Sequence, residues 1–319
     1  MKKCFVLLVL VAQSFSLPAQ DMPKQNVDAL IALVDGGKAD DVIQQMMPIA
    51  QSTSRSPSER GRAWTLIGFA LKEDNKFAPA QRAYEQALQL FNEAGVRDQD
   101  YAAALDYFAA LYMAVGDPAS ARPMLLESID IEKTTQKHLD LAGMYTDLAG
   151  VSIAQRKYRD AATELKLATA EAQLGSAKNK KLQLDIDSTS GWLASATGRT
   201  GEAVADYTRG LETCRQEYGE THPFTGWSYL LVGNAKAVNG DLKGALTSMQ
   251  VGLNLLKNTV GANNVRYLTG EIAYSKLLDQ SGSHTEAERV RLDAEQSLRA
   301  VYGGQCFNCS VSVSSLRAK

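Results

Sequence analysis

The sequence has 319 residues, of which 34 are Lys or Arg and 36 are Asp or Glu, so its formal net charge is only −2. This near balance argues against a general nucleic-acid binder, because such proteins carry a cationic excess that neutralises phosphates. Only 8 residues are Pro, and the abundance of Ala and Leu along the chain favours a mostly helical protein.

Residues 1–19 have the layout of a secretory signal peptide. Two lysines precede an apolar run over residues 5–12, which is too short for a membrane span, and a segment ending in Ala19 follows. Ala19 is the preferred cleavage position and Ser16 the second choice, with an uncleaved amino-terminal anchor as the alternative. No later stretch is apolar for long enough to cross a bilayer. We therefore expect an exported protein, periplasmic or secreted, with no stable membrane span after cleavage.

Residues 20–60 have the pattern of a degenerate helical hairpin and a linker. A helical pattern over residues 27–34 is broken by two glycines, and a second helical pattern starts just after them. Loss of the repeat pattern is typical of a cap, because one face of an end hairpin has no neighbour to pack against. We expect an amino-terminal cap, then a linker or exposed turn at residues 51–60.

From residue 61 to about residue 300, small residues recur with a fixed period. The first small residue of each second helix gives steps of 40 to 42 residues, at Ala80, Ala121, Ala161, Ala203, Ala245 and Ala287. Small residues also lie twelve positions before and seven positions after each of these alanines, and a glycine lies five positions before four of them. This phasing is expected where paired helices approach closely in every repeat, and it disfavours an irregular helical bundle. We predict six stacked helical hairpins over residues 61–300.

The first of these hairpins resembles the tetratricopeptide repeat. Its sequence matches the pattern W-x2-L-G-x2-Y followed by A-x3-F-x2-A, through Trp64, Ile67, Gly68 and Leu71 and then Ala80, Tyr84 and Ala87. The resemblance implies an all-α fold, a right-handed α-solenoid of antiparallel hairpins whose first helices line the concave side.

The long step between repeats resembles the kinesin-light-chain type of tetratricopeptide array. Gly219, His222 and Pro223 match the G-x2-H-P link of that type, and the segment 121–124 resembles its second helix. The segment 261–265 keeps the glycine of the link but not the His-Pro pair. The resemblance covers residues 61–300 and does not extend to motor attachment.

The resemblance also implies which positions face the groove, because they lie next to the packing positions of each first helix. The candidate partner-binding residues are Phe69, Lys72, Asp106, Met113, Thr146, Ile153, Ser188, Trp192, Trp227, Leu230, Asn234 and Lys276. They predict a mixed groove with few charges, suited to an extended or helical peptide with apolar anchors. Trp192 is the best single anchor, since aromatic residues dominate interface hot spots, and packing between neighbouring repeats is its alternative role.

Three cysteines remain after the predicted cleavage. Cys306 and Cys309 form a CxxC pair in a tail at residues 301–319. A local disulfide is the favoured interpretation, because a zinc site would need a second pair of ligands. Cys214 falls in a helical segment and is expected to be a small buried residue.

Two further positions carry local predictions. His222, next to Pro223 at a repeat junction, is expected to cap or pack, because a lone His lacks the partners that catalysis needs. Asp117 and Pro118 predict a helix start, and Pro123 predicts a mild kink in that helix.

Motifs that would indicate an enzyme are missing from the sequence. It has no nucleophile elbow, zinc-protease motif, phosphate loop or dinucleotide fingerprint, so no catalytic residue, metal ligand or cofactor is assigned. We expect an exported, non-catalytic scaffold that binds a peptide segment or a protein partner in its concave groove. The alternatives are an assembly or regulatory subunit of an envelope complex that acts through its ends or convex face, and a hydrolase with an unrecognised site.

Overall fold

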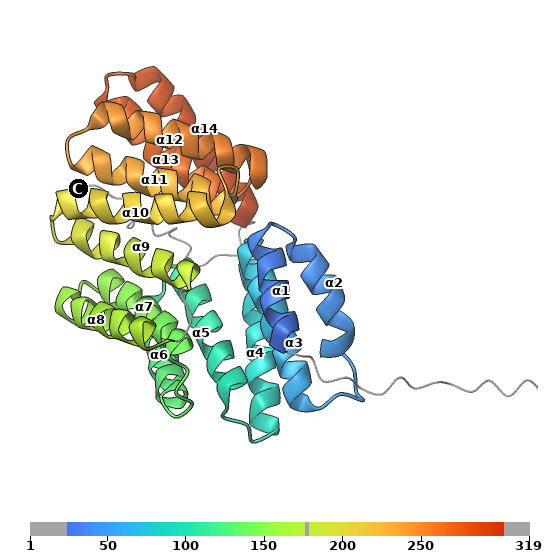
Figure 1. Ribbon diagram of the computed structural model, residues 1–319. Helices are drawn as coiled ribbons and strands as arrows, with labels where there is room; N and C mark the ends of the chain where they lie inside the picture. The colour runs from blue at the N-terminus through green and yellow to red at the C-terminus, as the bar shows by residue number, and fades with distance from the viewer. Residues whose placement is uncertain (1–23, 176–178, 303–319) are drawn as a thin grey trace, which may run out of the picture.

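The computed structural model describes residues 24–175 and 179–302, and within these ranges the regular structure is entirely helical (Figure 1). The helices follow one another as antiparallel pairs: α1 (Lys24–Asp35) with α2 (Ala39–Ala50), α3 (Pro57–Glu73) with α4 (Phe77–Glu93), α5 (Gln99–Ala114) with α6 (Pro118–Glu132), α7 (His138–Ala154) with α8 (Tyr158–Leu174), α9 (Lys180–Ala196) with α10 (Thr200–Tyr218), α11 (Pro223–Val238) with α12 (Leu242–Thr259), and α13 (Val265–Gln280) with α14 (His284–Tyr302).

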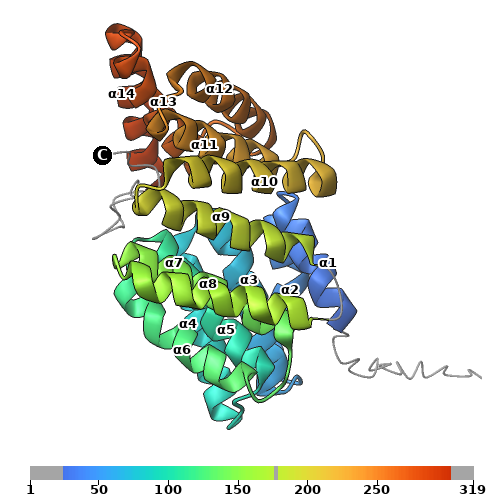
Figure 2. The same ribbon diagram turned by 60° about the vertical axis from the view of Figure 1, so that its left-hand side comes forward.

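The pairs stack into an all-α solenoid that curves strongly (Figures 1 and 2). Successive odd-numbered helices contact one another directly, α3 with α5, α5 with α7, α7 with α9 and α11 with α13. Each even-numbered helix from α2 to α12 instead bridges its own partner and the first helix of the next pair. The odd-numbered helices therefore form the inner side of the curve, as expected for the first helices of such an array.

The phased small residues are the contact points between paired helices. The six alanines that define the period are buried, with exposed fractions between 0% and 5%. A Cβ atom added to Gly68 would lie 2.7 Å from the Tyr84 ring, and one added to Gly233 would lie 2.7 Å from Met249. Because no side chain fits at these crossings, the helices pack closely there.

The turn inside each hairpin requires a residue with left-handed backbone conformation. The four glycines predicted as turn residues all have positive φ, between 76° and 88°, at Gly116, Gly198, Gly240 and Gly282. Two other hairpins use Asn75 and Arg156 at this turn, each with φ of 60°. Asn tolerates this conformation comparatively well, whereas Arg does not favour it, so the packing around it must impose it.

Local capping sets the start of two helices. Asp117 accepts a hydrogen bond from the Ser120 backbone N–H, which confirms the helix start predicted there, and α6 continues past Pro123. Ser56 and Glu59 form a reciprocal capping box ahead of α3. Because of this box, α3 begins at Pro57, inside the stretch expected to be a linker.

Two ion pairs join the beginning of the array to its later part. Lys181 Nζ in α9 lies 2.7 Å from Asp35 Oδ2 at the end of α1. An Arg266 guanidinium nitrogen in α13 lies 2.7 Å from Glu73 Oε2 at the end of α3. The solenoid thus curves until its first repeats meet its last ones, and both views place α1 beside the ends of α9 and α10.

Three further sequence predictions concern the signal peptide, the cysteines and a membrane span. Residues 1–19, with the predicted signal peptide, and the Cys306–Cys309 pair lie outside the described residues. Cys214 is fully buried, as predicted, and its thiol is free. None of the described helices is both long and apolar enough to cross a membrane.

Candidate functional site on the inner face

Four of the twelve predicted groove residues are buried in helix packing. Phe69, Thr146, Ile153 and Leu230 are between 0% and 7% exposed. Thr146 donates its hydroxyl hydrogen bond to the carbonyl of Ala142, one turn earlier in the same helix. The prediction that these four side chains face a partner is wrong, because the curve presses each first helix against the next.

The other predicted groove residues are more accessible. Lys276 is exposed, and seven are half-buried: Lys72, Asp106, Met113, Ser188, Trp192, Trp227 and Asn234. Trp192 belongs to the core around α7, and a Cβ atom added to Gly150 would lie 3.5 Å from its ring. Trp192 thus packs between neighbouring repeats, which is the alternative role considered for it above.

Three carboxyl groups lie on successive inner helices, Asp106 of α5, Asp147 of α7 and Asp185 of α9, and Asp147 interacts with each of the other two. Asp147 and Asp185 are exposed to solvent, although protein surrounds them on several sides. Enclosure together with solvent access is what the concave side of a tightly curved array provides. Of the three, only Asp106 was among the predicted groove residues.

The enclosure shifts the acid–base behaviour of these groups. Burial raises the pKa of Asp147 to about 6 and the pKa of Asp185 to about 7. Burial and the charge of Asp147 hold the pKa of Asp106 well above its usual range, and the protonated Asp106 donates a hydrogen bond to Asp147. Asp106 and Asp147 therefore titrate as a pair that holds a proton near neutral pH.

The cations nearby are committed to other partners. Glu73 Oε1 lies 2.6 Å from Lys72 Nζ, and its other oxygen receives Arg266, while Lys181 is paired with Asp35. Burial alone would raise the pKa of Glu73, but the two cations outweigh burial and hold it well below its usual range. In the described part of the chain, no ion pair reaches Asp147 or Asp185.

An aromatic group lies beside the closing ion pairs, at the start of α11. His222 stacks on Tyr218 with ring centroids 4.8 Å apart, and Phe224 packs edge-on against both rings. His222 Nδ1 accepts a hydrogen bond from the Phe224 backbone N–H, which confirms the predicted capping and packing role. Lys181 and Arg266 each lie 5.8 Å from the centre of the Phe224 ring.

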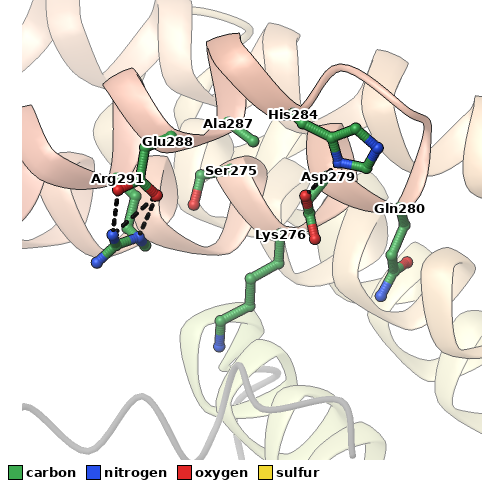
Figure 3. Close-up of a pocket in the computed structure, with 8 residues that line it drawn as sticks. All are labelled: Ser275, Lys276, Asp279, Gln280, His284, Ala287, Glu288 and Arg291. Atoms are coloured by element: carbon green, nitrogen blue, oxygen red, sulfur yellow. Dashed lines mark hydrogen bonds and ion pairs between the residues drawn. The ribbon is translucent and has the colours of Figure 1, made fainter.

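A separate open pocket of about 360 Å³ lies between α13 and α14 (Figure 3). It contains the residue types of a hydrolytic triad, Ser275, His284 and Asp279, and His284 Nδ1 lies 2.6 Å from Asp279. Ser275 is 2% exposed and donates its hydroxyl to the Ile272 carbonyl rather than to His284. Since a nucleophile must contact its base, this arrangement does not form a triad.

Within residues 24–175 and 179–302, no group of three or more His, Cys, Asp or Glu side chains is arranged to hold a metal ion. The three inner-face carboxyls are thus an acidic surface spread over three helices.

The comparisons with known proteins agree with this architecture. Tetratricopeptide-repeat family profiles match residues 61–93 and residues 191–224. No curated protein matches the sequence. The fold and its inner face define the class of helical repeat proteins that stack hairpins into a curved solenoid. Within that class, these two segments of the chain match the tetratricopeptide repeat.

Several solved structures are similar to this chain at low sequence identity. A Rap protein complexed with competence and sporulation factor is 11% identical, with a TM-score of 0.68 over 88% of this chain and 77% of that one. The Rap conjugation gene regulator of plasmid pLS20 with the Phr* peptide is also 11% identical, with a TM-score of 0.56 over 92% and 96%. The kinesin light chain TPR-like repeats of Podosopora anserina are 18% identical, with a TM-score of 0.45 over 65% and 98%.

Proposed function

We propose that this tetratricopeptide-repeat protein is a non-catalytic scaffold that holds a peptide segment of a partner on its inner face. The observation that carries the proposal is the set of carboxyl groups on α5, α7 and α9, which are enclosed by the array and of which Asp147 and Asp185 form no ion pair among the described residues. A polar surface left in this state is suited to a ligand that replaces enclosed water and supplies hydrogen-bond donors.

The fold supports this proposal. Two of the structures similar to this chain are described as complexes, one with competence and sporulation factor and one with the Phr* peptide. A curved array of this kind is therefore compatible with a bound peptide. The inner face of this chain is built from the helices of successive repeats. A segment bound there would therefore contact several repeats at once.

Binding is tested with a mixed pool of decapeptides passed over the immobilised protein. The strongest binder is then used in hydrogen–deuterium exchange, which reports the helices whose amides become protected. We expect added protection in α5, α7 and α9 and none in α4, α6 and α8. Protection confined to α1, α2 or the even-numbered helices would instead favour a subunit that acts through its end or convex face.

We also propose that the scaffold works outside the cytoplasm. The support comes from residues 1–19, whose basic start, apolar run and small residue at the preferred cleavage position match a signal peptide. Fusion of residues 1–60 to alkaline phosphatase, which is active only after export, tests this part. Phosphatase activity is expected with the intact leader and should be lost when a charged residue replaces Leu8 or Val9 in the apolar run.

A further inference from the structure

Two ion pairs connect parts of the array that are far apart in the sequence. They join Asp35 to Lys181 across 146 residues and Glu73 to Arg266 across 193 residues. Throughout the described ranges, helices in extensive contact belong to the same hairpin or to successive hairpins. Among the described residues, no cluster of buried apolar side chains has members in both α1–α3 and α9–α13. The closure of the curve therefore depends on charged side chains rather than on a shared core.

The four charged groups lie at helix ends that do not favour their charges. Asp35 and Glu73 are the last residues of α1 and α3. Lys181 and Arg266 are the second residues of α9 and α13. The helix dipole stabilises acidic groups near an N-terminus and basic groups near a C-terminus, so each helix alone disfavours its own charge. The arrangement becomes favourable when the carboxyl ends of α1 and α3 meet the amino ends of α9 and α13, and it thus favours the closed form.

Opening this closure would leave the charged groups with other partners or with water. Glu73 lies 2.6 Å from Lys72 Nζ in its own helix. Lys181 and Arg266 each lie 5.8 Å from the centre of the Phe224 ring, which belongs to their own side of the closure. Because the apolar cores of the two sides are separate, opening exposes little apolar surface. Small rotations between successive repeats are enough to change the curvature of a solenoid.

We propose that the two ion pairs form an electrostatic latch that holds the array closed, and that its release opens the inner face without unfolding the helices. The latch consists of Asp35 with Lys181 and of Glu73 with Arg266, both at 2.7 Å. The two cations are 40% and 35% exposed, so dissolved ions reach them. The range of a charge falls from about 10 Å at 0.1 M salt to about 3 Å at 1 M. The open form should therefore gain population as the ionic strength rises.

The opening is tested without any ligand. Small-angle X-ray scattering of the purified protein measures its radius of gyration at about 0.1 M and about 1 M NaCl. Circular dichroism measures the helix content of the same samples. We expect a larger radius of gyration at the higher salt concentration, with the helix content unchanged. The double variant Asp35→Asn/Glu73→Gln should have the larger radius at the lower concentration already and should respond little to salt.

A matched control removes two carboxylates that do not cross the closure. Asp130 and Asp293 are 77% and 66% exposed, and each pairs with a cation of its own helix, α6 or α14. The variant Asp130→Asn/Asp293→Asn changes the net charge by the same amount as the latch variant and should behave as the unmodified protein does. An equal expansion of this control would assign the effect to net charge and overturn the latch.

Two further outcomes would also overturn the inference. One is a radius of gyration that changes neither with salt nor in the latch variant. The other is an expansion that is accompanied by loss of helix content, because the protein would then be unfolding rather than opening. If the latch variant alone loses helix content, the salt series of the unmodified protein decides.

The consequence of the latch for binding rests on the proposed function. A minor conformer is commonly populated at about 10% or less, so the latch variant should bind an inner-face peptide about tenfold faster or more. Stopped-flow fluorescence with the strongest binder of the decapeptide pool measures this rate. Peptide protection of α5, α7 and α9 without any expansion would overturn the latch and leave the scaffold proposal standing. Expansion without peptide binding would overturn the scaffold proposal and leave the latch.

Discussion

The guanidinium of Arg266 lies 2.7 Å from the carboxylate of Glu73, although 193 residues separate them in the sequence. Their side chains are 35% and 15% exposed, so this contact is more shielded than the surface ion pairs of the outer helices. Together with the pair between Lys181 and Asp35, it ties the ends of α1 and α3 to helices in the later repeats. The curvature of the inner face therefore depends on a few charged contacts as well as on helix packing.

The first prediction concerns the strength of this contact. In a double-mutant cycle, Glu73→Gln and Arg266→Gln should show a coupling energy of about 1–2 kcal/mol, because both partners are partly shielded and hydrogen-bonded. The exposed pair of Arg289 and Asp293, 64% and 66% exposed, provides the control and should couple by less than about 0.5 kcal/mol. Urea unfolding measures both cycles, and equal coupling in the two would contradict a special role for the closing pair.

The second prediction concerns the pH dependence of stability. Burial raises the pKa values of Asp147 and Asp185 to about 6 and about 7 in the folded state, from 3.8. At pH values between the unfolded pKa of 3.8 and these folded values, the folded protein retains protons that the unfolded chain has released. These groups therefore lower the free energy of unfolding as the pH rises from about 4 to about 7. Asp147→Asn and Asp185→Asn should each flatten this slope.

The measurement is a series of urea unfolding curves across that pH window. Asp293→Asn, an exposed carboxylate on α14, should leave the slope as it is in the unmodified protein. If the inner-face variants and this control give the same slope, the carboxyls are not enclosed as the structure describes.

The third prediction tests the close helix crossings. Gly68→Ala should destabilise the protein by about 1–3 kcal/mol, because the new methyl would lie 2.7 Å from a Tyr84 ring that is 0% exposed and has no room to move. Gly143→Ala is the matched helical control, since nothing lies within 4 Å of its Cβ position. That substitution should stabilise α7 by about 0.5–1 kcal/mol through its helix propensity. A destabilisation of similar size in both variants would argue against the crossing as the cause.

The fourth prediction concerns His222. Burial lowers its pKa, with a further contribution from Arg266 and Lys181, and the neutral ring accepts the hydrogen bond that caps α11. Because the folded pKa lies below the usual value of 6.5, the contribution of this group is present above about pH 6.5. It is lost as the pH falls through that value, since the unfolded chain takes up the proton first.

The capping role predicts how variants at this position differ. His222→Ala should cost about 1 kcal/mol in the free energy of unfolding, the typical value of a lost cap. His222→Asn keeps a capping acceptor and should retain much of the stability while losing the acid-side dependence. Unfolding curves at two pH values distinguish them, and an alanine variant as stable as the asparagine variant would rule out the cap as the source.

Much of the fold could be predicted from the sequence because helix crossings admit only small residues. Their regular phase at Ala80 and its five counterparts predicts the order and spacing of the hairpins. The turn glycine was a less complete signal, since Asn75 and Arg156 replace it in two hairpins. The start of α3 was misplaced because a capping box at Ser56 initiates the helix ahead of the first repeat residue.

The inner-face site was harder to predict. Asp106, Asp147 and Asp185 lie at different distances from the period-defining alanine of their own repeats, 15, 14 and 18 residues before it. These three residues therefore do not occupy equivalent positions of the repeat, so the repeat pattern does not group them. The twist and curvature of the array bring them together. Leu230, predicted to face the groove, is instead buried because its side chain packs against Gly252 of α12 and Gly270 of α13.

An open solenoid frays from its ends, because each terminal repeat has a neighbour on one side only. In this array, the two long-range ion pairs connect helices near the start to helices in the later repeats, so the two ends are not independent of each other. Loss of the amino-terminal hairpin would leave Lys181 of α9 without its partner Asp35, and loss of the later repeats would leave both Glu73 and Asp35 without theirs. Unfolding at one terminus should thus destabilise the repeats at the other. We expect the repeats to unfold as one cooperative unit rather than one after another.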